Sequence, residues 1–297
     1  GGGLILTLGA AHTGGAAPGV VGVEGARPAG PGAAWAGATA ALHDAPLHVF
    51  ASTDDCAGPT RTLSEAERTR RRAEAERVVA EAAGIAAEAA DAELTVTTEI
   101  CPDLVIPALL DRSARARVIA LGSRGSGVYL PGMLGSVTTA VVRHARCPVA
   151  VVHDSSATDA VARRAPVVVG VDGSEHSVAA VEFALIEASR REVDLIAVHA
   201  WCDAGAVTIP ADWAAVRTTE EAVLAERLAG YEQQYPEVAI RRVVVSDRPV
   251  PALHAAAASA QLLVVGSRGR GGFTGMLLGS VSNALLHTVA CPMVVVR

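Results

Sequence analysis

The sequence lacks the features that mark several large classes of protein. None of its apolar runs approaches the length that a bilayer-crossing helix needs. Its five cysteines include no CxxC pair, which argues against a zinc site or a disulfide framework and suits a reducing cytoplasm. The formal net charge of −6 at pH 7 argues against binding to nucleic-acid phosphates. The apolar N-terminal stretch has no basic flank of the kind seen in signal peptides, so we expect a soluble cytoplasmic protein.

The chain contains an internal repeat. The segment "VGSRGRGGFTGMLLGSVS" at 265–282 has a twin, "LGSRGSGVYLPGMLGSVT", at 121–138. Both read G-S-R-G, then nine residues, then G-S-V and a hydroxyl residue. Likewise "VVGVEG" at 20–25 matches "VVGVDG" at 168–173. This indicates a tandem duplication, and we predict domains at 18–153 and 166–297 joined by a linker at 154–165.

Apolar strands alternate with helices in each copy, which predicts an α/β fold. In the second copy the patterns place strands within 166–171, 193–201, 238–246, 261–266 and 292–297, and helices within 174–192, 218–235, 250–260 and 279–290. Strands of this kind form a parallel sheet covered on both faces. We therefore predict two tandem five-stranded parallel-sheet domains of Rossmann-like, doubly wound type. Their ligands should lie at the carboxyl ends of the strands.

The glycine-rich segment 265–282 follows the fourth strand and precedes a helix. Loop amides and a helix N-terminus together favour an anion. Arg268 and Arg270 can add charge-assisted hydrogen bonds, and the hydroxyls of Ser280 and Ser282 can cap the helix or donate to phosphate. Asp172 ends the first strand at the same sheet edge, where its carboxylate can accept from a ribose hydroxyl or an adenine amine. An anion site and a carboxylate at one edge fit a nucleotide.

Other chemistries fit the residues less well. The loop lacks the lysine of a Walker A motif and any acidic residue to hold magnesium or activate water, so fast hydrolysis is not expected. Ser174 in "GSEH" fits a helix cap better than a nucleophile, since G-x-S-x-G is absent. Asp172 does not follow the receiver phosphoacceptor pattern. His199 fits a packed or hydrogen-bonded histidine better than a metal ligand.

The motifs G-x-x-G-x9-G-S and V-G-V-D-G-S resemble those of the ATP-binding class of universal stress proteins, and two copies resemble the tandem members common in actinobacteria. The resemblance covers about residues 20–297. It implies ATP, with Mg²⁺ bound through the phosphates and not by protein side chains. In the second copy the implied contacts are Gly170, Val171, Asp172, Ala200, Val265, Gly266, Arg268, Gly269, Gly279, Ser280, Val281 and Ser282. In the first copy they are Gly22, Val23, Glu24, Leu121, Gly122, Arg124, Gly125, Gly135, Ser136, Val137 and Thr138.

The first copy departs from this pattern. Glu24 replaces the aspartate and pushes its carboxylate one methylene further into the ligand space. Ala26 stands where the second copy has Ser174. The segment "GARPAGPGAAW" puts prolines and glycines where a helix should start, so that helix should begin late. Pro131 stiffens the loop. We expect the first site to bind more weakly than the second.

Two functions of different classes remain open. The first is a non-enzymatic, nucleotide-dependent regulator in a stress or growth-arrest response. The alternative is a slow ATP hydrolase or AMP-forming enzyme of a related adenine-nucleotide-binding fold. The short apolar strands that end the two copies, 149–152 and 293–297, should also pair within the chain as a pseudo-twofold dimer. That pairing would leave the outer surfaces for any homodimer.

Overall fold

The computed structural model describes residues 3–7, 19–24, 30–54, 64–123, 134–153, 156, 162–201, 213–270 and 277–297. The chain divides into two compact units, Gly1–Thr158 (unit 1) and Asp159–Arg297 (unit 2), and each is described by itself. A short 3₁₀ helix, Ala162–Arg164, lies within the stretch predicted as linker. The finer domain boundaries stay predictions.

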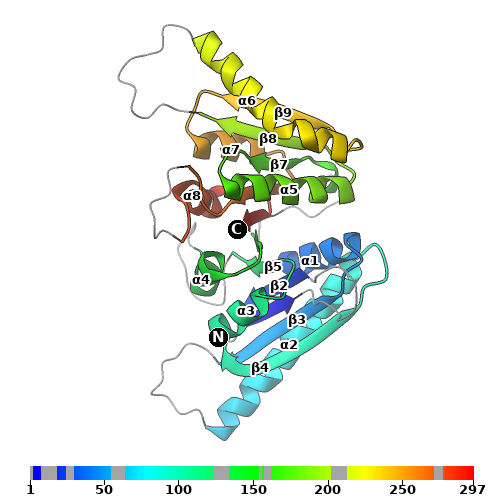
Figure 1. Cartoon of the computed structure of the whole chain (residues 1–297). Helices are drawn as coiled ribbons and strands as arrows, with labels where there is room; N and C mark the ends of the chain where they lie inside the picture. Colours follow the sequence, from blue (N-terminus) through cyan, green and yellow to red (C-terminus); the bar gives the residue numbers. More distant parts are fainter. Residues whose placement is uncertain are drawn as a thin grey trace. The chain divides into compact units, whose positions relative to one another are not determined.

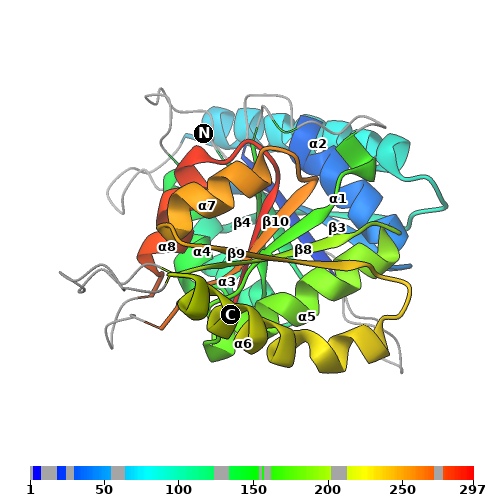
Figure 2. The same ribbon diagram turned by 90° about the horizontal axis from the view of Figure 1, so that it is seen from above.

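Unit 2 contains a parallel sheet with helices on both faces. Its elements are β7 (Val167–Gly170), α5 (Glu175–Arg190), β8 (Leu195–Ala200), α6 (Trp213–Gln234), β9 (Ile240–Val245), α7 (Pro249–Ala257), β10 (Leu262–Gly266), α8 (Ser280–Thr288) and β11 (Met293–Val296). The strand order is β11-β10-β7-β8-β9, and neighbouring strands run parallel. Helices α5 and α6 cover one face of this sheet, and α7 and α8 cover the other (Figures 1 and 2). Every predicted element of this copy is present.

The apolar runs of unit 2 become its buried strands. Val167, Val168 and Val169 are fully buried, as expected for a strand with helices on both faces. Helix α5 begins after Ser174, whose hydroxyl accepts a hydrogen bond from the amide of Ser177 at 3.2 Å. This confirms the predicted role of Ser174 as a cap. The strand order changes direction between β7 and β10, which places the carboxyl ends of these two strands at a switch point of the sheet.

Unit 1 repeats the α/β plan and adds a strand. Its elements are β1 (Gly3–Thr7), β2 (Gly19–Glu24), α1 (Gly30–Leu42), β3 (Leu47–Asp54), α2 (Glu65–Ala89), β4 (Val96–Leu104), α3 (Val105–Ser113), β5 (Ile119–Gly122), α4 (Ser136–His144) and β6 (Val149–Val152). The order is β4-β3-β1-β2-β5-β6. The α/β class and the two parallel-dominated units are confirmed. The sixth strand, β1, was not predicted for this copy; it is formed by the short apolar run at 3–7 and pairs antiparallel with β2, β3 and β5.

Helix α1 is described from Gly30 onward, and residues 25–29 before it lie outside the described residues, so its late start stays a prediction. Its middle packs very closely on α2, where a Cβ added at Gly37 would overlap the backbone of Ala86. The absence of a side chain at Gly37 therefore sets how closely these two helices approach.

Candidate functional site

A cavity of about 410 Å³ opens at the carboxyl ends of β7, β8 and β10 in unit 2. Its size lies within the range of small-molecule sites. The lining residues are Gly170, Val171, Asp172, Ser177, Val198, Ala200, Pro249, Leu253, Val265, Gly266, Arg268, Gly269, Arg270, Gly279, Ser280, Val281 and Ser282. All twelve positions named for the second copy from the sequence are among them. The repeat motif and the end of the first strand therefore line one cavity.

The lining combines an apolar wall with a polar one. Val198 on β8 and Pro249 and Leu253 on α7 supply apolar surface of the kind that packs against a flat heterocycle. The glycine-rich loop and the first turn of α8 supply backbone amides and two arginines. A single ligand that has both an apolar ring and an anionic group would suit this lining.

The N-terminus of α8 is left open toward the cavity. Its N-cap is Gly279, which has no side chain, and no side-chain hydrogen bond caps the helix. The amide of Gly279 donates to the carbonyl of Ser267 at 2.7 Å, which fixes the loop against the helix. An uncapped helix start presents backbone N–H groups and partial positive charge. This end of the cavity is therefore suited to an anion.

The hydroxyl of Ser282 has another role than the two that its sequence position offers. It donates to the carbonyl of Gly266 at 2.6 Å, so it neither caps α8 nor is free for a phosphate. The twin residue Thr138 donates in the same way to the carbonyl of Gly122 at 2.8 Å. In both units the fourth residue of G-S-V-S/T therefore ties the helix to the end of the preceding strand.

The carboxylate of Asp172 already has protein partners. Oδ1 accepts from the Ser174 amide at 2.9 Å and from its hydroxyl at 2.7 Å, and Oδ2 accepts from the Arg270 amide at 3.0 Å. This carboxylate therefore joins the turn after β7 to the glycine-rich loop. A Cβ at Gly269 would overlap Oδ2, so this contact requires glycine there. Each oxygen retains lone-pair capacity for a ligand donor.

The turn after β7 depends on a second glycine. Gly173 has a φ of +80°, which favours glycine, and a Cβ there would also overlap the guanidinium of Arg227 on α6. The hydroxyl of Ser177 accepts from the amides of Asp172 and Gly173 at 3.1 and 3.4 Å. The backbone of this turn is thus held by α5 and overlaid by α6.

Five lining residues were not among the named contacts: Ser177, Val198, Pro249, Leu253 and Arg270. Pro249 and Leu253 could have been found, because they lie four residues apart at the start of a helix that follows a carboxyl strand end. Val198 could not be identified from the sequence, because strand alternation alone does not say which face of β8 borders a ligand.

His199 is a hydrogen-bonded core histidine, as its sequence context predicts. It is 3% exposed, with Nδ1 2.6 Å from the carbonyl oxygen of Val171 and Nε2 2.9 Å from Oε2 of Glu220. In the described parts of the chain, no group of three or more His, Cys, Asp or Glu residues could hold a metal ion. A search of the same residues finds no helix long and apolar enough to cross a membrane.

Unit 1 does not assemble its positions in the same way. In unit 2, β7 and β8 are direct neighbours along their whole paired length, from Val167 to Gly170. In unit 1 the corresponding strands β2 and β3 pair directly only at Gly19 and Leu47, and β1 pairs with both of them, with its Gly3 opposite Glu24 at the end of β2. The backbone of Gly22, Val23 and Glu24 lies on β2, Leu121 and Gly122 end β5, and Gly135, Ser136, Val137 and Thr138 start α4. Arg124, Gly125 and Pro131 lie outside the described residues.

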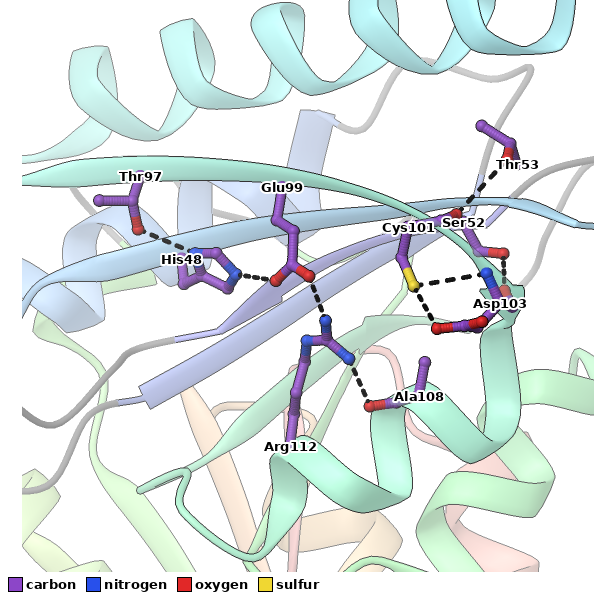
Figure 3. Close-up of polar contacts among 9 residues, drawn as sticks. All are labelled: His48, Ser52, Thr53, Thr97, Glu99, Cys101, Asp103, Ala108 and Arg112. Atoms are coloured by element: carbon purple, nitrogen blue, oxygen red, sulfur yellow. Dashed lines mark hydrogen bonds and ion pairs between the residues drawn. The ribbon is translucent and has the colours of Figure 1, made fainter.

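A polar network occupies one face of unit 1's sheet (Figure 3). His48 on β3 contacts Thr97 Oγ1 at 2.8 Å and Glu99 Oε2 at 2.9 Å, and Glu99 also binds Arg112 on α3. Strand register and the repeat place Ile196, Val243 and Ala256 at the positions of His48, Glu99 and Arg112. The network therefore belongs to unit 1 alone and ties α3 to the edge strand β4.

Burial and hydrogen bonding set the titration of this network. Burial raises the pKa of the Glu99 carboxyl, but the hydrogen bonds from His48 and Arg112 outweigh burial, and the net pKa is lowered. Next to it, burial raises the pKa of the Cys101 thiol, and the hydrogen bond to Asp103 raises it further. The thiol at Cys101 is therefore a poor nucleophile, and the network reads as a structural tie between α3 and β4.

The internal repeat agrees with a comparison to known families. The model of the universal stress protein family matches residues 20–153 and again 163–297. The chain belongs to the universal stress protein family. A universal stress protein of Mycobacterium tuberculosis H37Rv is 45% identical over 283 residues, which cover 94% of this chain and 96% of that protein. A second one from the same strain is 48% identical over 204 residues, covering 68% and 69%.

The solved structures agree at the level of the fold. A universal stress protein from Archaeoglobus fulgidus matches with a TM-score of 0.57 at 22% identity, over 80% of this chain and 84% of that one. The two family matches and the relative that is aligned over almost its whole length confirm the tandem universal stress protein organisation predicted from the motifs.

Proposed function

We propose that unit 2 binds an adenine nucleotide, ATP with Mg²⁺ on its phosphates, and that the protein is a nucleotide-dependent regulator in a stress or growth-arrest response. The observation that carries this proposal is the cavity in which an apolar wall faces a glycine-rich loop and an uncapped helix start. The adenine would pack against Leu253 and Val198, and the phosphates would meet the amides of α8. The likeness of the loop motif to the ATP-binding class supports ATP in particular.

The lining also favours binding over turnover. Asp172 is the one carboxylate among the lining residues, and both of its oxygens accept hydrogen bonds from Ser174 and Arg270. A general base needs a free basic group within reach of the attacking water. Arg268 and Arg270 offer positive charge for phosphates without supplying such a base. We therefore expect the protein to retain bound ATP and to hydrolyse it only slowly.

The first test places a charge at the expected phosphate position. Gly279→Asp should raise the Kd for ATP at least about tenfold, because a carboxylate would stand at the helix start where phosphate is expected. Gly279→Asn, which has nearly the same bulk without the charge, should lose much less. Gly279 has an ordinary φ of −70°, and an added Cβ meets Ser267 O at 3.3 Å, so both variants should fold.

Isothermal titration calorimetry on the full chain, with circular dichroism as the folding control, measures this difference. Unchanged ATP affinity in a folded Gly279→Asp variant would falsify the phosphate assignment. The nucleotide that copurifies with the protein separates the two functional classes. Retained ATP supports a regulator, whereas ADP or AMP formed from added ATP supports the slow enzyme.

A further inference from the structure

His199 lies next to the ligand cavity but on the other side of the sheet. Alternation along β8 turns Val198 and Ala200 toward the cavity and His199 toward the face that α6 covers. Its imidazole is 3% exposed and reaches two groups, the carbonyl of Val171 and the carboxylate of Glu220 on α6. The ring therefore bridges α6 and the residue that follows β7.

The contacts of this imidazole require a proton on each side of the ring. Its partners are a carbonyl oxygen at 2.6 Å and a carboxyl oxygen at 2.9 Å. A neutral imidazole has one N–H donor, whereas an imidazolium has two. Both hydrogen bonds form together only when a proton lies between Nε2 of His199 and Oε2 of Glu220, as in an imidazolium–carboxylate pair. A neutral ring would keep its proton for the Val171 carbonyl and turn a lone pair toward Glu220.

The Val171 carbonyl belongs to the turn that shapes the cavity. The amide of Val171 donates to the Val198 carbonyl at 2.9 Å, and the next two amides donate to Ser177. His199 supplies the hydrogen bond to the buried carbonyl of Val171. Asp172 then carries the turn to the glycine-rich loop through the Arg270 amide. A shift of the Val171–Asp172 peptide would therefore move one wall of the cavity relative to the other.

The fold itself does not require this arrangement. By the strand register of the two repeats, Ala51 in unit 1 occupies the position of His199. Unit 1 forms the same strand pair, β3 with β4, without the histidine. The imidazole is thus specific to the unit whose cavity brings the named contacts together.

We propose that His199 and Glu220 are positioning residues of the unit 2 cavity, an imidazolium–carboxylate pair that holds the Val171–Asp172 turn in its ligand-binding shape and couples occupancy of the cavity to α6. This inference rests on the proposed nucleotide function. Neither residue touches the ligand. Both act through the Val171 carbonyl and the turn that follows it.

A pH dependence follows from the same geometry. The ring faces Glu220 from α6 and the Val171 carbonyl from β7, and β9 pairs with His199 through the apolar Val244. Asp172 on the same turn is held by Ser174 and Arg270, and Arg227 lies over Gly173. Loss of the second imidazole proton as the pH rises would break the bond to Glu220 and loosen the turn. Ligand affinity should therefore fall with rising pH.

The test compares the full-length protein with three variants. Glu220→Gln keeps the size of the side chain and can donate to a neutral imidazole, so it should abolish the pH dependence. His199→Ala reproduces the residue of unit 1 and should raise the Kd about tenfold or more. The matched control is Glu221→Gln, the next residue of α6, whose exposed carboxylate pairs only locally with Arg217 at 2.8 Å.

Calorimetric titrations with adenosine and with Mg-ATP between about pH 6 and 8.5 supply the readout, because adenosine has no group that titrates in this range. We expect the wild type and Glu221→Gln to bind several-fold more weakly at the upper pH, and Glu220→Gln to show a flat profile. Identical profiles in all three proteins, with ATP bound normally, would overturn the inference and leave the proposed function standing.

Amide hydrogen exchange on the ligand-free protein distinguishes a failure of this inference from a failure of the proposed nucleotide function. His199→Ala should speed exchange at the amides of Asp172 and Gly173, whereas Glu220→Gln, which can keep the imidazole in place, and Glu221→Gln should not. If the wild type binds neither adenosine nor ATP, the nucleotide function is wrong and the coupling to a nucleotide falls with it. Unchanged exchange at these two amides in His199→Ala would show that the pair does not hold the turn.

Discussion

The carboxylate of Asp172 joins the turn after β7 and the start of α5 to a loop that lies far away in the sequence. It binds the start of α5 through Ser174 and the glycine-rich loop through Arg270. A hydrogen bond to a charged acceptor contributes about 1.5–3 kcal/mol, so this one side chain can hold the loop in place without a ligand. A ribose or adenine donor would share these oxygens with the protein. Ligand binding and loop position are therefore linked at a single residue.

The thiol of Cys291 provides a prediction at the same scale. Burial raises its pKa to about 11, and the residue is 8% exposed. Because the thiolate is the reactive form, iodoacetamide at about pH 8 should label Cys291 far more slowly in the native protein than in urea. Mass spectrometry of timed digests measures this.

The raised pKa of Cys291 also has a consequence for stability. The unfolded chain ionises this thiol at lower pH than the folded one does. The contribution of this thiol to the free energy of unfolding is therefore full below about pH 9 and declines as the pH rises toward 11.

The labelling experiment can also contradict the prediction. Equal rates of iodoacetamide labelling in native buffer and in urea would show that the site opens on the timescale of the reaction.

At the scale of elements, the contact between α1 and α2 depends on one glycine. Gly37→Ala would place a methyl group against the backbone of Ala86. Alanine gains about 1 kcal/mol over glycine in helix propensity, but overpacking against backbone costs about 1–3 kcal/mol. Because backbone cannot rotate away, we expect a net loss of stability.

The control for this change is Gly84→Ala. Gly84 lies in α2, and an added Cβ there meets nothing within 4 Å, so propensity alone should act and raise stability by about 0.5–1 kcal/mol. Urea unfolding of the two variants and the wild type measures the sign of each change in the free energy of unfolding. A stabilised Gly37→Ala would mean that the two helices can separate at little cost.

The elements themselves were predictable, and the reasons are local. The β-branched runs, the Ser174 cap and the glycine-rich loop each specify structure within a few residues, and all of them are present. The apolar wall of the cavity was harder, because Leu253 reaches it through the packing of α7 on β7 and β8. The carbonyl groups to which Ser282 and His199 bind could not be predicted either, because these hydrogen bonds depend on tertiary contacts. The strand at 3–7 was missed because it lies before the repeat and has no twin.

At the scale of the whole molecule, the expected pairing of the terminal strands stays a prediction. Within its own unit each of β6 and β11 is an outermost strand made of four apolar residues. Unpaired apolar edges invite association. If the two strands pair within the chain, those amides of 149–152 and 293–296 that point away from β5 and β10 should exchange slowly. Hydrogen exchange resolved to single residues tests this, and rapid exchange at these amides would argue against the pairing.

The two units should also differ in ligand binding. In unit 1, β1 pairs with both strands that correspond to β7 and β8, and Glu24 stands where unit 2 has Asp172. Both features disturb the sheet edge at which β7 and β8 meet side by side in unit 2. We therefore expect the full chain to bind close to one ATP with high affinity.

Calorimetry on the intact protein and on a pair of twin variants assigns that site. Gly279→Asp should remove the tight phase, whereas Gly135→Asp at the twin N-cap of α4 should leave it unchanged. The same substitution at equivalent positions changes the charge of the protein equally in both variants, so a difference between them locates the ligand. Two equal sites in the wild type, each removed by its own variant, would show that neither the extra strand nor the longer carboxylate of Glu24 weakens unit 1.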